Sequence, residues 1–172
     1  VHQVLIDGLE AAGYSLPEAA GVTQETAPEL LGDCVGVVTS TRLQLDASLL
    51  DRSPLLRWVG RMGSGMEIID LAYAAKRGIR CFSSPEGNSN AVAEHAMGML
   101  LSLTKKIASS WLEVREGEWI RDANRGMELE GKTVGIIGFG HTGRAFARKL
   151  AGFDVRILAY DKYHPAEQPG VI

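Results

Sequence analysis

The chain has 172 residues, of which 45% are hydrophobic and 23% are charged, and its formal net charge is −3. This composition is that of a globular protein with a buried core, and it excludes wholesale disorder. The acidic charge excludes a general nucleic-acid binder, which needs a basic surface, and the lack of an apolar run of about 18 residues argues against a membrane span.

The chain opens with a helical pattern. Apolar residues from Val4 to Ala12 recur on one helical face, and Gly13 follows as a stop signal. A domain of alternating strands and helices usually opens with a strand instead. Because Val1–Gln3 reads as an internal start, we expect a first strand to precede it.

Strands and helices then alternate as far as Ser83. Asp46 can cap a short helix that runs to Leu50, and a helix that begins at Ile68 would end at Gly78. Such alternation predicts a parallel sheet with helices on both faces. The predicted strands are the apolar runs 34–39, 56–60 and 79–83.

A turn-rich PEGN sequence is the best boundary between two domains, residues 1–88 and 89–172. Ser89 or Asn90 can cap a long helix that reaches about Ala108. The small and apolar stripe on this helix is too extensive for a surface helix, so it predicts packing across a domain or subunit interface. The stripe consists of Ala93, Met97, Leu100, Leu101 and Thr104.

The strongest motif lies in the second domain. A predicted strand, Thr133–Ile137, leads into the G-x-G-x-x-G sequence Gly138–Gly143, which opens a helix over His141–Ala151. The next strand, Val155–Tyr160, ends at Asp161. This is the context that the dinucleotide-binding fingerprint requires. A plain strand–turn–helix, or a site for a flavin or another nucleotide, stays open as an alternative.

Each residue of the fingerprint has a physical task. Gly138 allows the tight turn, Gly140 lets a pyrophosphate approach the backbone, and Gly143 lets the helix pack closely on the strand. The helix N-terminus offers N–H groups and a positive dipole to phosphates. Asp161 can accept hydrogen bonds from the adenosine ribose and would repel a 2′-phosphate, which favours NAD over NADP. His141 lies at the edge of this site.

A second glycine loop follows the strand that ends at Gly60. Gly63 and Gly65 would expose backbone N–H groups at the carboxyl edge of the sheet, where open α/β sheets bind ligands. Arg61 could add a bidentate contact to a carboxylate. The alternative is an ordinary glycine turn beside a surface arginine.

The other residues with reactive side chains give no strong indication of a catalytic or metal-binding role. Cys34 and Cys81 are isolated thiols, which suggests a reducing, cytoplasmic location. His95 follows Glu94 on the long helix, but adjacent helical residues point in different directions, so a structural role is favoured. No cluster has metal-ligand spacing, so we expect no metal site.

Four motifs, in this order, resemble the D-2-hydroxyacid dehydrogenase family, most closely its phosphoglycerate dehydrogenase branch. They lie between about Asp33 and Pro165. The resemblance implies an α/β protein with a flavodoxin-like substrate domain and an NAD-binding Rossmann domain, both incomplete in this chain, and a homodimer. The motifs are GRMGSGMEIIDLAYAAKRGI, SSPEGNSNAVAEHAMGMLLSL, ELEGKTVGIIGFGHTGRAFARKL and AYDKYHP.

The resemblance also implies residue roles. Asp161 would bind the ribose, and Ser84 would lie near the nicotinamide. The residues implied to hold the pyrophosphate are Gly138, Gly140, His141, Thr142 and Gly143. Those implied to face a small anionic 2-hydroxy or 2-oxo acid are Arg61, Ser64, Gly65 and Asn88.

Some positions depart from the family pattern. Ile68 stands where the family usually has an asparagine, and Ala96 stands where many members have a threonine. Ser40 stands where the phosphoglycerate enzymes often have an arginine that contacts the substrate phosphate. The sequence therefore does not identify 3-phosphoglycerate as the substrate. The family's catalytic arginine, glutamate and histidine follow the second Rossmann strand. We therefore expect no catalytic residue among these 172 and no turnover by this chain alone.

The predicted function is hydride transfer between NAD and a D-2-hydroxy acid or 2-oxo acid. Fold cannot exclude relatives that have lost this activity. One alternative is a non-catalytic NAD-sensing protein similar to the C-terminal-binding-protein corepressors. Another is a truncated product that mainly oligomerises.

Overall fold

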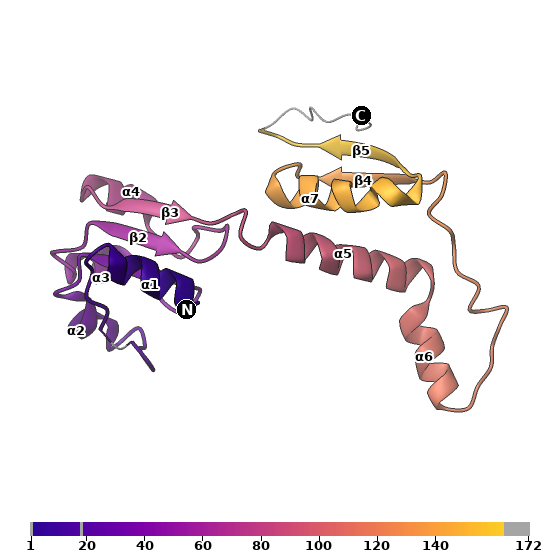
Figure 1. The fold of residues 1–172 in the computed structure, drawn as a ribbon, viewed down its shortest axis with the longest axis horizontal. Coiled ribbons are helices and arrows are strands. Elements are labelled where there is room, and N and C mark those ends of the chain that lie inside the picture. The colour runs from indigo at the N-terminus through magenta and orange to yellow at the C-terminus, as the bar shows by residue number, and fades with distance from the viewer. Residues whose placement is uncertain (1, 18, 164–172) are drawn as a thin grey trace. The chain divides into compact units, whose positions relative to one another are not determined.

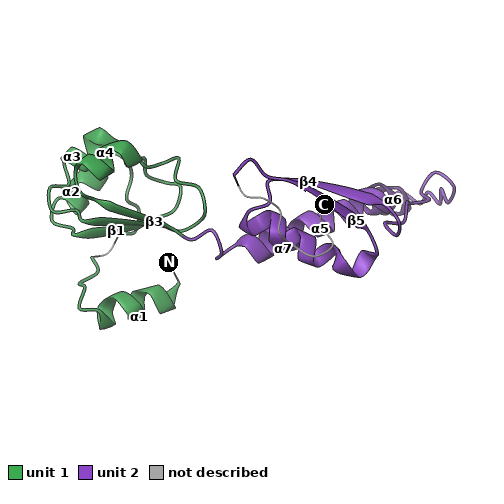
Figure 2. Ribbon diagram, turned by 90° about the horizontal axis from the view of Figure 1, so that it is seen from above, with its two compact units in different colours: residues 1–83 green, residues 84–172 purple. Residues whose placement is uncertain are grey.

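The computed structural model describes residues 2–17 and 19–163 (Figure 1). The chain divides into two compact units, Val1–Ser83 and Ser84–Ile172, coloured separately in Figure 2. The division falls a few residues before the boundary expected at residue 88. Each unit is an α/β structure built on parallel strands, as the alternating sequence pattern predicts.

Unit 1 is built on a three-stranded parallel sheet in the order β1-β2-β3. Helices α3 and α4 lie on one side of this sheet and α1 on the other, which confirms the prediction of helices on both faces (Figure 2). The strands are β1 (Gly36–Thr39), β2 (Trp58–Arg61) and β3 (Arg80–Ser83). The helices are α1 (Gln3–Ala11), α2 (Ala27–Leu31), α3 (Ala47–Asp51) and α4 (Leu71–Lys76).

The three strands of unit 1 end level with one another. Thr39 pairs with Arg61, and Arg61 pairs with Ser83, so the loops after all three strands leave the same edge of the sheet. The central strand is the best covered, because Val59 is fully buried. An aliphatic core beneath the sheet holds this edge in place; its largest fully buried members are Leu45, Leu49, Leu50 and Val59.

Helix α4 begins later than predicted. Ile68 and Ile69 are buried in the core but are not helical, because Ile68 lies in a turn and Ile69 forms a β-bridge with Leu45. The helix starts only after Asp70, whose carboxylate accepts a hydrogen bond of 2.9 Å from the Tyr73 N–H. Buried apolar spacing alone could not separate these two conformations, because both place the isoleucines inside.

Helix α1 matches the predicted element, but none of its residues is buried. Val4 keeps 71% of its surface exposed. Tyr14, just after the helix, makes an edge-to-face contact with Trp58 at 5.8 Å between ring centroids. The strand expected to precede Val1 stays a prediction.

Unit 2 contains a two-stranded parallel sheet and three α-helices within the described residues (Figure 1). Ile136 and Ile157 face the helices and are buried, whereas Ile137 is 90% exposed on the other face. The motif residues His164 and Pro165 lie outside the described residues. The elements are α5 (Ser89–Thr104), α6 (Ile107–Arg115), β4 (Thr133–Ile137), α7 (His141–Leu150), a 3-10 turn (Ala151–Phe153) and β5 (Arg156–Tyr160).

Helix α5 differs from the prediction at both ends. Its N-cap is Asn88, while the Ser89 hydroxyl donates to the Glu86 carbonyl at 3.0 Å. It ends at Thr104 because Lys106 adopts a left-handed conformation with φ of 54°, after which α6 begins. The predicted single helix to Ala108 is therefore two helices.

The apolar stripe of α5 packs inside unit 2, against α7 (Figure 1). Met97 and Leu100 contact the core of the sheet, but Ala93 is the one described residue of α5 that is fully buried. Packing of this helix across a subunit interface stays a prediction. In the described part of the chain, no helix has the length and apolar character to cross a membrane.

The packing of unit 1 can be tested at Gly36. A β-carbon there would lie 2.0 Å from the indole ring of Trp58, its neighbour on β2. We expect Gly36→Ala to destabilise the chain by about 1–3 kcal/mol, because the ring must move. Gly135→Ala, on strand β4 of unit 2, is the matched control, since a β-carbon at Gly135 meets nothing within 4 Å. Equal urea midpoints for both variants would contradict this account.

Candidate functional site

The G-x-G-x-x-G loop lies where β4 passes into α7. Gly138 has φ of +91°, a conformation that side chains other than glycine rarely adopt, and its N–H donates to the Tyr160 carbonyl at 2.8 Å. A β-carbon at Gly143 would lie only 2.1 Å from the Gly138 carbonyl oxygen. These two glycines therefore allow the turn and the close start of the helix.

Gly140 differs from both. It is the N-cap of α7, and a β-carbon there would meet nothing within 4 Å. The first backbone hydrogen bond of the helix runs from the Arg144 N–H to the Gly140 carbonyl. The N–H groups of His141, Thr142 and Gly143 precede that bond, at the positive end of the helix dipole. The protein itself does not require a glycine at 140, but an approaching anion would.

Asp161 closes the site at the end of β5. Its carboxylate accepts hydrogen bonds from the Phe139 N–H at 2.6 Å and from the Tyr163 N–H at 2.8 Å. Phe139 is completely buried, which anchors the loop in the core.

His141, at the first position of α7, is about half exposed and faces Glu86. The distance between His141 Nε2 and Glu86 Oε1 is 3.6 Å, an ion pair whenever the imidazole is protonated. Sequence reasoning missed Glu86, because an acidic residue in the Pro85–Asn88 turn carries no spacing signal. It places a negative charge beside the loop expected to receive a phosphate.

The second glycine loop lies at the carboxyl edge of the unit 1 sheet. The Arg61 side chain is only 11% exposed, and its Nη1 donates to the Met62 carbonyl at 2.6 Å. A β-carbon at Gly63 would collide with this guanidinium, and one at Gly65 with the carboxylate of Glu67. The loop glycines thus accommodate two charged side chains of the same loop, a reason for glycine that the sequence did not reveal.

The other predicted ligand-facing residues lie in exposed positions. Ser64 belongs to the Arg61 loop in unit 1, whereas Ser84 and Asn88 belong to unit 2. Asn88 makes no side-chain capping bond, although it is the N-cap of α5. Their roles toward a substrate or nicotinamide stay predictions.

The remaining reactive residues are structural or unengaged. The pKa of Glu94 is lowered by its hydrogen bonds to Lys149 and Asn90, so this carboxylate links α5 to α7. His95 is exposed. Both thiols, Cys34 and Cys81, are free, and burial raises the pKa of each. Among the described residues, no cluster of side chains could hold a metal ion.

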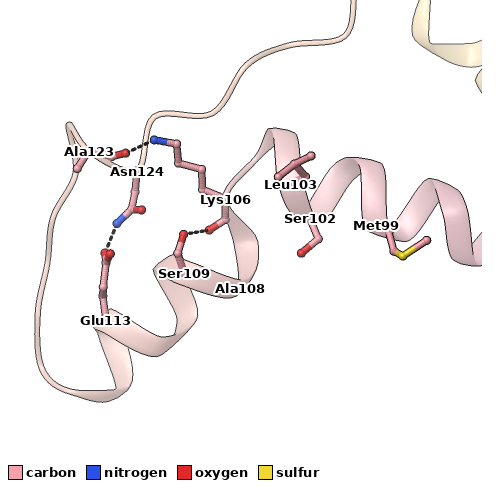
Figure 3. Close-up of a pocket in the computed structure, with 9 residues that line it drawn as sticks. All are labelled: Met99, Ser102, Leu103, Lys106, Ala108, Ser109, Glu113, Ala123 and Asn124. Atoms are coloured by element: carbon pink, nitrogen blue, oxygen red, sulfur yellow. Dashed lines mark hydrogen bonds between the residues drawn. The ribbon is translucent and has the colours of Figure 1, made fainter. Parts of the chain in front are cut away.

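One hollow in the described residues lies away from both glycine loops. It has a volume of about 650 Å³ and is formed by α5, α6 and the segment after α6 (Figure 3). Lys106 Nζ donates to the Ala123 carbonyl at 2.5 Å across it, and Asn124 donates to Glu113. The hollow is open, and none of the predicted site residues lines it. The candidate site is therefore identified by the residues of the glycine loops and not by the volume of a cavity.

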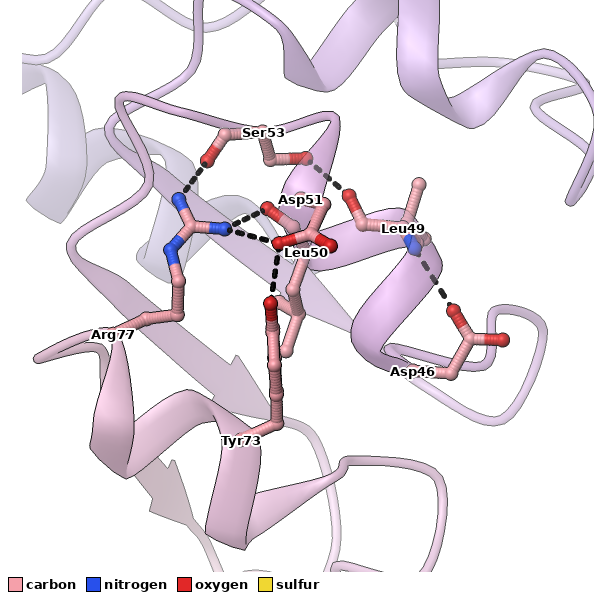
Figure 4. A network of polar contacts seen from close by, with 7 residues as sticks. All are labelled: Asp46, Leu49, Leu50, Asp51, Ser53, Tyr73 and Arg77. Carbon is pink, nitrogen blue, oxygen red and sulfur yellow. Dashed lines mark hydrogen bonds and ion pairs between the residues drawn. The ribbon is translucent and has the colours of Figure 1, made fainter.

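A polar cluster in unit 1 is also structural. The Arg77 guanidinium donates to the Leu50 carbonyl at 2.5 Å and pairs with Asp51 at 3.4 Å (Figure 4). Tyr73 donates its hydroxyl to Asp51 at 2.5 Å, and this bond raises the pKa of Tyr73. Arg77 thereby ties the end of α3 to α4, because its guanidinium also donates to the Ser53 carbonyl just after α3 at 3.4 Å.

Comparison with known proteins is consistent with this geometry. Residues 97–171 match the model of the "D-isomer specific 2-hydroxyacid dehydrogenase, NAD binding domain". The chain is 32% identical to D-3-phosphoglycerate dehydrogenase of Archaeoglobus fulgidus over 99% of its own length and 33% of the relative's. It is 34% identical to hydroxypyruvate reductase of Thermotoga maritima over 75% of the chain and 42% of that protein.

A solved structure is also similar. The NAD-dependent formate dehydrogenase of Staphylococcus aureus, in complex with NAD, superposes with a TM-score of 0.81 at 28% identity, covering 98% of this chain and 52% of that one. D-Lactate dehydrogenase of Aquifex aeolicus shares the fold, with a TM-score of 0.80 at 24% identity. The chain spans about a third of the length of the curated phosphoglycerate dehydrogenases that it matches.

The loop glycines allow a paired stability test. Gly143→Ala should destabilise the chain by about 2–3 kcal/mol, because its β-carbon would press on a backbone carbonyl. Gly140→Ala should change stability by no more than about 0.5 kcal/mol, since its β-carbon meets open space. Urea unfolding of both variants measures the difference. Equal losses would show that the loop is packed differently.

Proposed function

Because this chain belongs to the D-isomer-specific 2-hydroxyacid dehydrogenase family, we propose that its glycine loop binds the pyrophosphate of NAD in a hydroxyacid oxidoreductase. The observation that carries the proposal is Gly140, where a β-carbon meets nothing within 4 Å, at the start of a helix whose first three N–H groups have no partner within the helix. Anions bind at such helix N-termini through hydrogen bonds and the helix dipole. Residues 97–171 supply this NAD-binding domain.

The proposed roles follow from position. The backbone at Gly140, His141, Thr142 and Gly143 donates to the pyrophosphate. Asp161, fixed beside the loop by the Phe139 N–H, accepts from the adenosine ribose and repels a 2′-phosphate.

The proposed reaction is hydride transfer with a small D-2-hydroxy acid or 2-oxo acid. NAD, when bound, accepts or supplies the hydride. We propose that Arg61, Ser64 and Gly65 bind the substrate carboxylate, because Arg61 carries a nearly buried positive charge at the carboxyl edge of the sheet. Ser84 is proposed to lie near the nicotinamide, and Asn88 to contact the substrate. The relatives' names include dehydrogenases and a reductase of such acids.

We also propose that the chain forms a homodimer through the exposed apolar surface of α5 and α6. Soluble monomers rarely leave so much apolar surface open. The exposed apolar residues of this surface are Met99, Leu103, Ile107, Trp111, Leu112 and Val114.

We infer a reducing, cytoplasmic location from the two free thiols.

NAD binding tests the proposal directly. Gly140→Ala should weaken NAD binding by at least about tenfold while keeping wild-type stability, because a methyl group would block the pyrophosphate. Gly135→Ala is the matched control and should bind NAD normally. Titration calorimetry on the 172-residue chain measures both. Wild-type affinity in the Gly140 variant would refute the assigned site.

Cofactor choice tests Asp161 separately. Asp161→Asn removes the charge but keeps an oxygen that can accept from the Phe139 N–H, so the loop should stay folded. We expect NADP to bind more tightly to this variant than to wild type, while NAD binds more weakly. An unchanged ratio of the two dissociation constants would argue against a role for Asp161 in excluding the 2′-phosphate.

The dimer surface is tested by Leu103→Glu. This side chain is 79% exposed in the single chain, so a charge there should not unfold it but should oppose apolar association. Sedimentation should show a monomer for this variant and a dimer for Val4→Glu, whose site in unit 1 is 71% exposed. A monomeric wild-type chain at micromolar concentration would contradict the proposal.

A further inference from the structure

The guanidinium of Arg61 is only partly used by the protein. Nη1 donates to the Met62 carbonyl at 2.6 Å, but Nε is buried and has no hydrogen-bond partner among the described residues. Nη2 faces Glu67 Oε1 at 3.8 Å, beyond hydrogen-bond length. The edge of the guanidinium that carries Nε and Nη2 is therefore the unsatisfied one. A planar carboxylate fits such an edge with two parallel hydrogen bonds.

Glu67 occupies the space that such a ligand would approach. Its carboxylate folds back over Gly65, where a β-carbon would lie 2.0 Å from Oε2 and 2.8 Å from Oε1. The side chain nevertheless remains 68% exposed. An ion pair this exposed and this long stabilises little, so Glu67 is held loosely and can leave.

We propose that Glu67 is a built-in competitor for the anion site of Arg61, and therefore determines which anionic substrates the site accepts; this rests on the proposed role of Arg61 in substrate binding. A ligand carboxylate that reaches Nε and Nη2 bidentately replaces a loose contact by two charge-assisted hydrogen bonds. A neutral ligand gains nothing from displacing Glu67. Glu67 thus lowers the affinity of the site for carboxylate ligands, and only an anion that makes both hydrogen bonds displaces it.

The same geometry explains both loop glycines. Gly63 has φ of +137° and leaves room for the guanidinium, while Gly65 leaves room for the Glu67 carboxylate. A side chain at either position would hold the charged group away from the loop. The loop sequence therefore favours a site that is closed by its own acid when no ligand is bound.

The test is a titration of the 172-residue chain with pyruvate, followed through the amide chemical shifts of Gly63 and Gly65. Pyruvamide is the uncharged probe. Glu67→Gln keeps the size of the side chain and removes its charge, and should tighten pyruvate binding about two- to fivefold without changing pyruvamide binding. Glu25→Gln, an exposed position in the same unit, controls for net charge and should have no effect.

The outcomes separate this inference from the proposed function. Unchanged or weaker pyruvate binding by Glu67→Gln overturns it, as does an equal gain in Glu25→Gln or no pyruvate binding by Glu67→Gln. Arg61→Lys tests the underlying role, because a lysine cannot make the bidentate contact and should weaken pyruvate binding. NAD titration of the same samples reports the cofactor site independently.

Discussion

The close approach of α7 to the end of β4 is the constraint on which the proposed cofactor site depends. Gly143 has no side chain, so the helix can begin almost in contact with the Gly138 carbonyl. That approach sets where the first helical turn lies, and the N–H groups of this turn have no partner within the helix. It also sets where α7 lies, and α5 packs against α7. A larger residue at 143 would therefore disturb both packing and site.

In each unit, a charged side chain expected to affect ligand binding also contacts the loop that carries the site. In unit 2, the Asp161 carboxylate binds the Phe139 N–H, so the acid expected to read the ribose also fixes the loop. In unit 1, the nearly buried Arg61 faces the acid Glu67 of its own loop. A buried charge must be compensated, and a loose compensating partner can be replaced by a ligand. Each loop thus carries the charge that decides its selectivity.

Much of the fold could be predicted because local signals agreed. The strand Thr133–Ile137, the cap by Asp46 and the stop at Gly78 all follow from short-range rules and occur as expected. The start of α4 could not be predicted, since buried isoleucines suit a helix and a bridge equally. The break at Lys106 was also hidden, because a left-handed lysine has no sequence signature.

For the candidate site, the sequence located the loops but not their internal contacts. The glycine spacing predicted a tight turn into a helix at Gly138, Gly140 and Gly143. In the structure the three glycines differ in the space that a β-carbon would have at each. The contacts of Glu67 and Glu86 could not be predicted, because they depend on how long, exposed side chains fold back on their loops. Such contacts leave no periodicity in the sequence.

The central claim is that the glycine loop is the place where NAD binds. The most direct measurement is an amide chemical-shift map of the isotope-labelled 172-residue chain as NAD is added. We expect the largest changes on the N–H groups of His141, Thr142 and Gly143, with a further change at Phe139, whose N–H is bonded to Asp161. Saturable binding that leaves these four amides unmoved would contradict this expectation.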